Sequence, residues 1–244
     1  MRILLPPSET KLRGGVPRSG PLNLSFPVQD VVRTNLQVAL EKLCRDNPTE
    51  AARILKLGPK SVDELGNNVF SDAPVMPAID RYTGVLYSAS DVANWTAGQR
   101  TWAAEHVFIH SALFGIISSG DEIPTYRLSH DTRLGGVSLS AHWGRGLSDA
   151  LIDMAAGDWV LDARSAGYRA LAPIPTGVTS LYLDVVSANG GKALNHFNKI
   201  HKGRLVAALV VAAPDLTTPE AFVSWADTVE IHVRQTLDSI TFLV

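Results

Sequence analysis

The segment spanning residues 107–129, VFIHSALFGIISSGDEIPTYRLS, constrains the fold most strongly. It begins with apolar residues, continues through Ile116 and Ile117, and then enters a polar turn that contains Asp121 and precedes Arg127. A buried element followed by a loop rich in hydroxyl, carboxylate and guanidinium groups is how rigid scaffolds present binding and catalytic residues. The simpler interpretation is a core element followed by a solvated turn, and the rest of the chain must decide between the two.

Short apolar segments alternate with helical patterns through much of the chain. Strands are predicted over residues 2–5, 85–87, 158–161, 180–186, 228–233 and 241–244, where apolar residues cluster or alternate. Helices are predicted over residues 28–45, 47–58, 61–65, 90–105, 147–154 and 195–213, and after a cap at Thr217 or Thr218, from apolar periodicity and capping residues. This alternation predicts an α/β or mixed α+β fold, with a mixed sheet flanked by helices. Because no linker or repeat interrupts it, residues 1–244 are expected to form a single compact domain.

Composition narrows the class of protein. The chain has 244 residues, of which 45% are hydrophobic, which is enough for a substantial core. The net charge of −2 excludes a generally basic nucleic-acid protein, so any such binding needs a local patch. Cys44 is the only cysteine, which excludes a disulfide framework and fits a cytoplasmic setting. The apolar start stops at Pro6 and no long apolar run follows, so neither a signal peptide nor a membrane helix is expected.

Standard enzyme signatures are absent from the sequence. There is no dinucleotide-binding or phosphate-loop glycine motif and no G-x-S-x-G nucleophile elbow. His196 and His201 are five residues apart, so they would point in different directions on a helix. We therefore predict no metal site and no cofactor, and we assign no catalytic residue.

Basic side chains gather on the long helix predicted over residues 195–213. His196, Lys199 and Lys202 recur at three-residue spacing and share one face, with Arg204 close by. Such a row suits the phosphates of a nucleic acid or of a small anion. A solvated basic helix face is the simpler alternative.

Polar residues also follow several predicted strands, where ligands collect in an α/β sheet. Arginines at four positions are candidates for an anion-binding cluster: Arg81, Arg127, Arg164 and Arg204. Glu9, Asp121 and Asp162 would balance this charge or act as acid/base groups, although structural ion pairs are the commoner use of such residues. The other candidates are Ser8, Thr10, Lys11, Tyr82, Thr83, Ser111, Tyr126, Ser165 and Tyr168.

Five segments and one tryptophan together resemble the YaaA-like peroxide-stress-response family. The matching pieces are LLPPSETK at 4–11, YTGVLY at 82–87, SALFGIISSGDEIPTYRL at 111–128, Trp143, residues 162–168, and NKIHKGR at 198–204. The resemblance implies a cytoplasmic protein that limits oxidative damage by lowering available iron. It also implies a compact α/β domain with a positively charged cleft that binds double-stranded DNA. Carried over by position, the cleft would be lined by Lys11, Arg127, Lys199, Lys202 and Arg204.

The family resemblance also implies an element like a helix-hairpin-helix. Residues 54–65, ILKLGPKSVDEL, predict a helix, a tight glycine turn and a second helix. Pro59 removes one of the hairpin amides that would hold a DNA backbone, so an ordinary helix pair is the favoured interpretation.

Three functions remain open at this point. The first is a stress-response protein whose basic cleft holds DNA phosphates, and the second is an enzyme acting on a small phosphorylated or carboxylated molecule in the same cleft. The third is a structural role with solvated polar loops and no ligand. The oligomeric state is not predicted.

Overall fold

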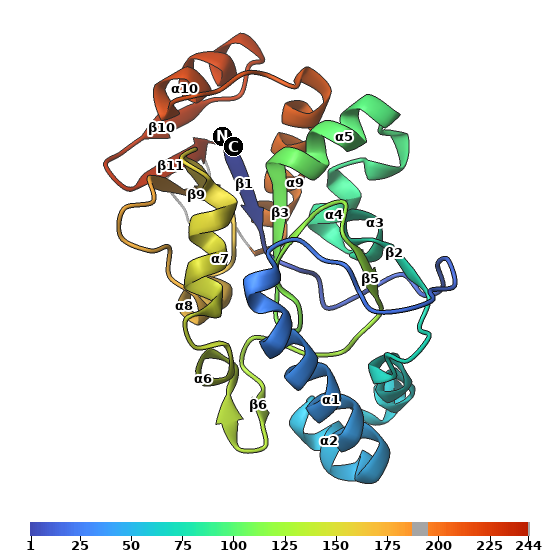
Figure 1. Ribbon diagram of the computed structural model, residues 1–244. Helices are drawn as coiled ribbons and strands as arrows, with labels where there is room; N and C mark the ends of the chain where they lie inside the picture. The colour runs from blue at the N-terminus through green and yellow to red at the C-terminus, as the bar shows by residue number, and fades with distance from the viewer. Residues whose placement is uncertain (187–194, 244) are drawn as a thin grey trace.

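The computed structural model describes residues 1–186 and 195–243, and its main sheet has seven strands within those residues (Figure 1). The spatial order is β10 (Val233–Gln235), β11 (Ser239–Leu243), β9 (Ser180–Val186), β8 (Val160–Asp162), β1 (Arg2–Leu5), β3 (Val107–Ser111) and β4 (Gly115–Ser118). The five inner strands pair in parallel, and the two edge strands pair antiparallel. The predicted α/β class with a mixed sheet is therefore confirmed.

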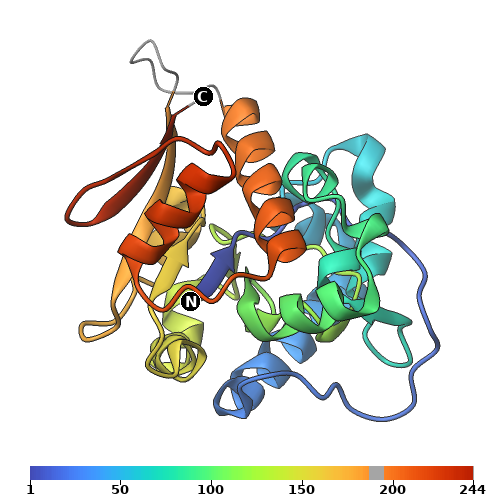
Figure 2. The ribbon, with the colours of Figure 1, turned by 90° about the horizontal axis from the view of Figure 1, so that it is seen from above.

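Helices cover both faces of this sheet. Seen from above, β1 lies between α9 (Asn195–Ala212) on one side and α1 (Asp30–Asp46) on the other (Figure 2). All five residues of β3 are buried, as expected for a strand that is covered on both faces. The other helices are α2 (Pro48–Ile54), α3 (Ala78–Arg81), α4 (Val85–Ala89), α5 (Ala97–His106), α6 (Leu139–Trp143), α7 (Gly146–Ala155), α8 (Ala166–Leu171) and α10 (Pro219–Thr228).

Smaller elements complete the fold. Three short 3₁₀ helices are described, η1 (Pro27–Gln29), η2 (Pro59–Asn68) and η3 (Val92–Asn94). Two ribbons lie outside the main sheet, β2 (Val75–Pro77) with β5 (Glu122–Pro124) and β6 (Arg133–Leu134) with β7 (Val137–Ser138). Among the described residues, no helix has the length and apolar character needed to span a membrane.

Side chains of η1 and α1 cover the β4 edge of the sheet. The Gln29 carboxamide pairs with the backbone of Ile116, donating to its carbonyl over 3.0 Å and accepting from its amide over 2.9 Å. Arg33 donates to the carbonyls of Phe114 and Ile116 over 2.8 and 2.9 Å. These groups take the place of a further strand, so the backbone of β4 is not left open for pairing with another chain.

Local signals predicted several elements well. β1 and β9 have the predicted bounds, and α9 ends one residue earlier than predicted. Thr218 caps α10 by accepting from the Ala221 amide, and Asn47 caps α2 by accepting from the Glu50 amide. The strand predicted over 241–244 is part of β11, and Val244 lies outside the described residues.

The strand predicted over residues 85–87 is wrong, because these residues begin helix α4. Gly84 turns the chain with φ of 103°, and α4 then packs closely on α9. At their contact, a Cβ on Gly203 would lie 2.2 Å from the Leu86 carbonyl oxygen. A short run of apolar residues has a strand's composition, but packing against a neighbouring helix decides its conformation.

Two further predictions need correction. The helix predicted over 90–105 is broken into η3 and α5, because Thr96 and Gln99 form a capping box that starts a new helix. The strand predicted over 228–233 is also wrong for most of its length. Thr228 still belongs to α10, and the chain turns through Glu230 at φ of 58° before β10 begins at Val233.

Candidate ligand-binding pocket

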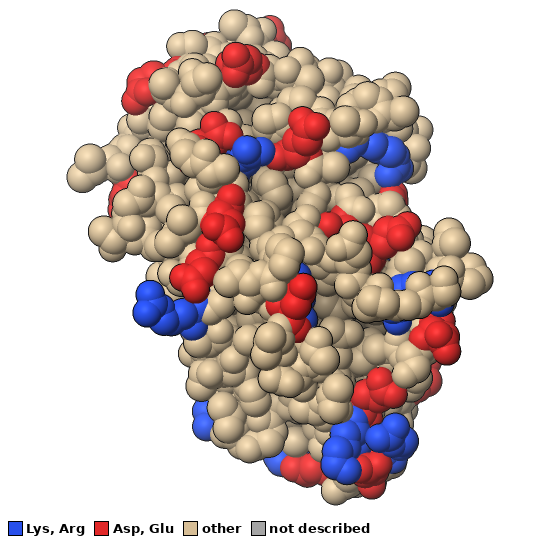
Figure 3. Space-filling view, viewed as in Figure 1, with Lys and Arg blue, Asp and Glu red and all other residues tan. Residues whose placement is uncertain are grey.

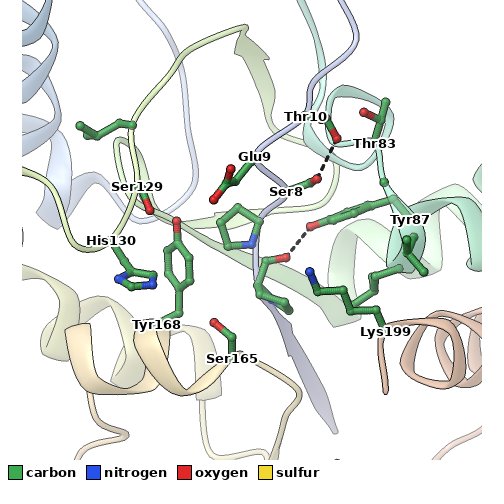
Figure 4. A pocket seen from close by; sticks show the side chains of 16 residues that line it. Ser8, Glu9, Thr10, Thr83, Tyr87, Ser129, His130, Ser165, Tyr168 and Lys199 are labelled. Carbon is green, nitrogen blue, oxygen red and sulfur yellow. Dashed lines mark hydrogen bonds between the residues drawn. The ribbon is translucent and has the colours of Figure 1, made fainter. Parts of the chain in front are cut away.

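A cavity of about 400 Å³ lies where the chain leaves the carboxyl ends of parallel strands β1 and β8 (Figure 4). Ligands of α/β sheets bind at this end of the strands, and small-molecule sites range from about 300 to 1,000 Å³. Five separate segments supply the lining, namely Pro6, Pro7, Ser8, Glu9, Thr10, Thr83, Gly84, Val85, Leu86, Tyr87, Leu128, Ser129, His130, Ser165, Tyr168 and Lys199.

Hydroxyl groups dominate the polar part of the lining. Ser8 and Thr10 share a hydrogen bond of 3.1 Å, and the Tyr87 hydroxyl donates to the Pro6 carbonyl over 2.8 Å (Figure 4). Lys199 is exposed, and it is the only lysine or arginine among the described residues that line the cavity. Within the part of the chain that the structure describes, the lining therefore offers many hydroxyl groups, the Glu9 carboxylate and the exposed ammonium of Lys199.

Lys11 fixes the loop that forms one wall. Its Nζ donates to the carbonyls of Ser8 and Glu9 over 2.9 and 3.2 Å, and it lies 4.1 Å from the centroid of the Tyr126 ring. Burial, together with the nearby Arg127 guanidinium, lowers the pKa of Lys11 to about 7. Near neutral pH this amine is therefore only partly charged, and its hydrogen bonds hold the loop in shape.

A chain of buried hydroxyls lies beside Lys11. The Tyr126 hydroxyl is 2.8 Å from both the Tyr82 hydroxyl and Ser111 Oγ. Ser111 Oγ already accepts from the amides of Leu113 and Phe114, so its own hydrogen is donated to Tyr126. Burial raises the pKa of Tyr126 to about 12 and raises the pKa of Tyr82 well above its ordinary value. The predicted site residues Tyr82, Ser111 and Tyr126 therefore do contact one another. Their hydroxyls are protonated and lie outside the pocket lining.

Two carboxylates hold Arg127. Its guanidinium lies 3.3 Å from Glu9 and 3.5 Å from Glu64. The Asn68 side chain fixes the Arg127 backbone, accepting from its amide over 2.8 Å and donating to its carbonyl over 3.1 Å. Arg127 is thus shared between Glu64 and Glu9, and Glu9 lies at the pocket wall.

Arg164 is completely buried in a network behind the pocket. It forms two hydrogen bonds to the Asp162 carboxylate, of 2.9 and 2.8 Å, and one of 3.0 Å to His110 Nδ1. Because a guanidinium only donates, His110 Nδ1 is the acceptor and the imidazole proton is on Nε2. Burial, with Arg164 next in importance, lowers the pKa of His110 well below its ordinary value, so His110 is neutral.

Arg81 and Lys202 also serve the framework. Arg81 is buried and donates to the carbonyls of Ile123 and Pro74 over 3.1 and 3.0 Å, and burial lowers its pKa to about 10. Lys202 is buried, donates to the Ala163 carbonyl over 3.1 Å, and has its pKa lowered to about 8 by burial. Both cations brace loops near the carboxyl ends of the strands.

The other predicted site residues lie apart from the cavity lining. Arg204 and His196 are exposed on α9. Asp121 closes the turn between β4 and β5, accepting from the Ser118 amide over 3.0 Å and from the Ser25 amide and hydroxyl over 2.9 Å each. Burial raises the pKa of Asp121. On the face shown in Figure 3, Lys and Arg side chains are interspersed with Asp and Glu.

Sequence reasoning missed His130, Ser129 and Tyr87. Ser129 is the last residue of the segment singled out above and His130 directly follows it, so extending the polar run after Arg127 would have included both. The strand predicted over residues 85–87 gives no sign that Tyr87 forms part of the pocket wall. Among residues 1–186 and 195–243, no three His, Cys, Asp or Glu side chains group as a metal site would require.

Comparison with known proteins relates the whole chain to a family. Residues 1–228 match the family model described as "Peroxide stress protein YaaA". A UPF0246 protein of Corynebacterium efficiens is 38% identical over 227 residues, covering 89% of this chain and 88% of the relative. UPF0246 proteins of Corynebacterium glutamicum and Streptomyces coelicolor are 37% and 36% identical, covering 96% and 90% of this chain and 95% and 85% of the relatives.

Proposed function

Because the chain belongs to the peroxide stress protein YaaA family, we propose that it acts in the peroxide response by binding a small anionic metabolite in this pocket. The observation that carries the proposal is the lining itself. It combines a volume suited to a small molecule with hydroxyls from several segments and the accessible Lys199 ammonium. An enzyme acting on a phosphorylated or carboxylated substrate is one form of this function.

The state of the other basic residues supports a small ligand. The buried cations already donate hydrogen bonds to protein groups. Arg81 and Lys202 donate to backbone carbonyls, and Arg164 donates to a carboxylate and a histidine. Withdrawing them would leave buried acceptors unpaired, which costs about 1–3 kcal/mol for each group. A ligand whose anionic group binds Lys199 leaves these buried hydrogen bonds intact.

The direct test is calorimetric titration with AMP, ribose 5-phosphate and citrate. We expect at least one of them to bind, and Lys199→Ala to weaken that binding by about tenfold, because a charge-assisted contact is lost. Lys60→Ala is the matched control, since Lys60 is exposed on η2 and does not line the pocket. Wild-type protein that binds none of the three would overturn the proposal, and equal binding by Lys199→Ala would overturn the assigned location.

Double-stranded DNA is a second candidate, favoured by the exposure of both Lys199 and Arg204 on α9. Binding to phosphates predicts affinity that falls steeply with salt. We expect a Lys199→Ala/Arg204→Ala double variant to abolish binding of labelled duplex at low salt if DNA is the ligand. A duplex that fails to bind the wild type at low salt removes this candidate.

We propose further, from the family resemblance, that this binding lowers the iron available for oxidative chemistry. Electron paramagnetic resonance of chelatable iron in peroxide-treated cells, with and without the protein, tests this. Equal iron signals in both cells would contradict it.

A further inference from the structure

His130 lines the pocket, and its ring is packed against neighbouring groups of the fold. It lies in the loop between β5 and β6. Its ring lies beside the Tyr168 ring, with centroids 5.0 Å apart and planes at 87°. Figure 4 shows His130 beside Tyr168 on one side of the cavity and Lys199 on the other, with Glu9 above and between them and Ser8, Thr10 and Thr83 above Lys199. The two nitrogen-bearing groups thus face the same space from different walls.

Gly167 makes room for this ring. A Cβ at Gly167 would lie 2.2 Å from His130 Nε2 and 2.5 Å from its Cε1, closer than any real contact. Gly167 lies in α8, where the helical backbone does not require glycine. The missing side chain therefore serves the placement of His130.

The histidine on the other side of Tyr168 differs sharply from His130. His110 is buried, fixed by Arg164 and neutral, with ring centroids 5.2 Å from Tyr168. By contrast, no hydrogen bond joins the His130 ring to another group within the described residues. His130 alone of the pair is placed to exchange a proton with a ligand.

We propose that His130, seated by Gly167 and Tyr168, binds one anionic end of the ligand as an imidazolium while Lys199 binds the other. The ligand would then be a small hydroxylated molecule with negative charge at both ends, such as a sugar bisphosphate. This inference rests on the proposed function and names its substrate class. Histidine suits the role because it changes charge between about pH 5 and 8.

Two carboxylates lie near His130 in the sequence or in the pocket, and both are paired. Asp131, the next residue, is paired with Lys56. Glu9 in the pocket is paired with Arg127, as described above. Glu9 shares that guanidinium with Glu64, and an incoming anion adds negative charge that favours the imidazolium of His130.

The test follows the histidine Cε1–H resonances by NMR across pH 5–9, with fructose 1,6-bisphosphate and fructose 6-phosphate as probes. We expect the bisphosphate to bind at least tenfold more tightly and to raise the pKa of His130, because a bound anion stabilises the imidazolium. The His130→Gln variant identifies the resonance and should bind both sugars equally. The His142→Gln variant is the control, since His142 is hydrogen-bonded to the Leu134 carbonyl and does not line the pocket.

The Gly167→Ala variant tests whether the position of the His130 ring matters, because it moves the ring without removing it. It keeps both cationic side chains but displaces the imidazole, so we expect a loss of about tenfold in bisphosphate affinity. His130→Gln keeps the test decisive if Gly167→Ala does not fold.

Each outcome decides something different. A bisphosphate that binds through Lys199 without perturbing His130, and with equal affinity in His130→Gln, overturns this inference and leaves the proposed function intact. Failure of both sugars to bind also overturns it, and the separate titrations with AMP, ribose 5-phosphate and citrate then decide the proposed function.

Discussion

Lys199 and Lys202 lie three residues apart on α9, and the fold gives them different roles. Lys199 is exposed at the pocket, whereas Lys202 is buried against the Ala163 carbonyl. Their spacing was visible in the sequence, but their exposure was not, because it depends on how the loop after β8 packs on α9. The same limit applies to Arg164, whose partner His110 is distant in sequence.

The pKa of Lys11 gives a test at the scale of one residue. Its pKa is about 7 in the folded protein against 10.5 for an ordinary lysine, so the unfolded chain binds more protons between these values. The free energy of unfolding should therefore rise from pH 7 to about 10 in the wild type, relative to Lys11→Met. Urea denaturation at several pH values measures this difference.

Lys60→Met serves as the control for removing an exposed lysine. Parallel pH profiles for the wild type and Lys11→Met would show that burial does not perturb the Lys11 amine.

At the scale of an element, the covering of β4 depends on Gly115. A Cβ there would lie 1.9 Å from Gln29 Oε1, and the residue has φ of 69°. Gly115→Ala should lower the free energy of unfolding by about 2–5 kcal/mol, from backbone strain and overpacking together. Gly136→Ala, at φ of 79° with open space around it, should cost only the strain of about 1–2 kcal/mol. Equal losses in chemical denaturation would mean that the Gln29 contact does not matter.

The contact between α4 and α9 gives a second prediction at this scale. Gly203→Ala should lower the free energy of unfolding by about 1–3 kcal/mol, because the new Cβ would meet the Leu86 carbonyl oxygen at 2.2 Å. Gly98→Ala, in helix α5 with no neighbour within 4 Å, should leave stability unchanged or raise it by up to about 1 kcal/mol. Thermal unfolding of both variants checks this, and a stabilising Gly203→Ala would contradict the described packing.

These elements also show what sequence reasoning captures. The caps at Asn47 and Thr218 were predictable because the capping residue and its partner amide are three residues apart. Residues 85–87 were not, because the contact that makes them helical comes from Gly203, far along the chain. Local chemistry predicts where helices start, whereas packing decides the conformation of short apolar runs.

At the scale of the whole molecule, the sheet brings together segments that are far apart in sequence. The loop after β1, the start of α4, the loop after β5, the start of α8 and a residue of α9 meet around one cavity. Ser8, Glu9, Thr10, Thr83, Ser165, Tyr168 and Lys199 were all predicted from their places beside apolar segments or on the basic helix face. The pairing of their segments depends on strand order, which no local pattern encodes.

The central claim is that the pocket carries the family's role in the peroxide response. Ser165→Trp would fill the cavity, and Ser165 makes no side-chain capping bond to α8 that the change would remove. Ser224→Trp, on an exposed position of α10, is the matched control.

The most direct measurement is survival of peroxide-treated cells that depend on this protein, with equal folded amounts of each variant. We predict that Ser165→Trp loses protection while Ser224→Trp keeps it. Full protection by Ser165→Trp would contradict the claim that the pocket is the functional site.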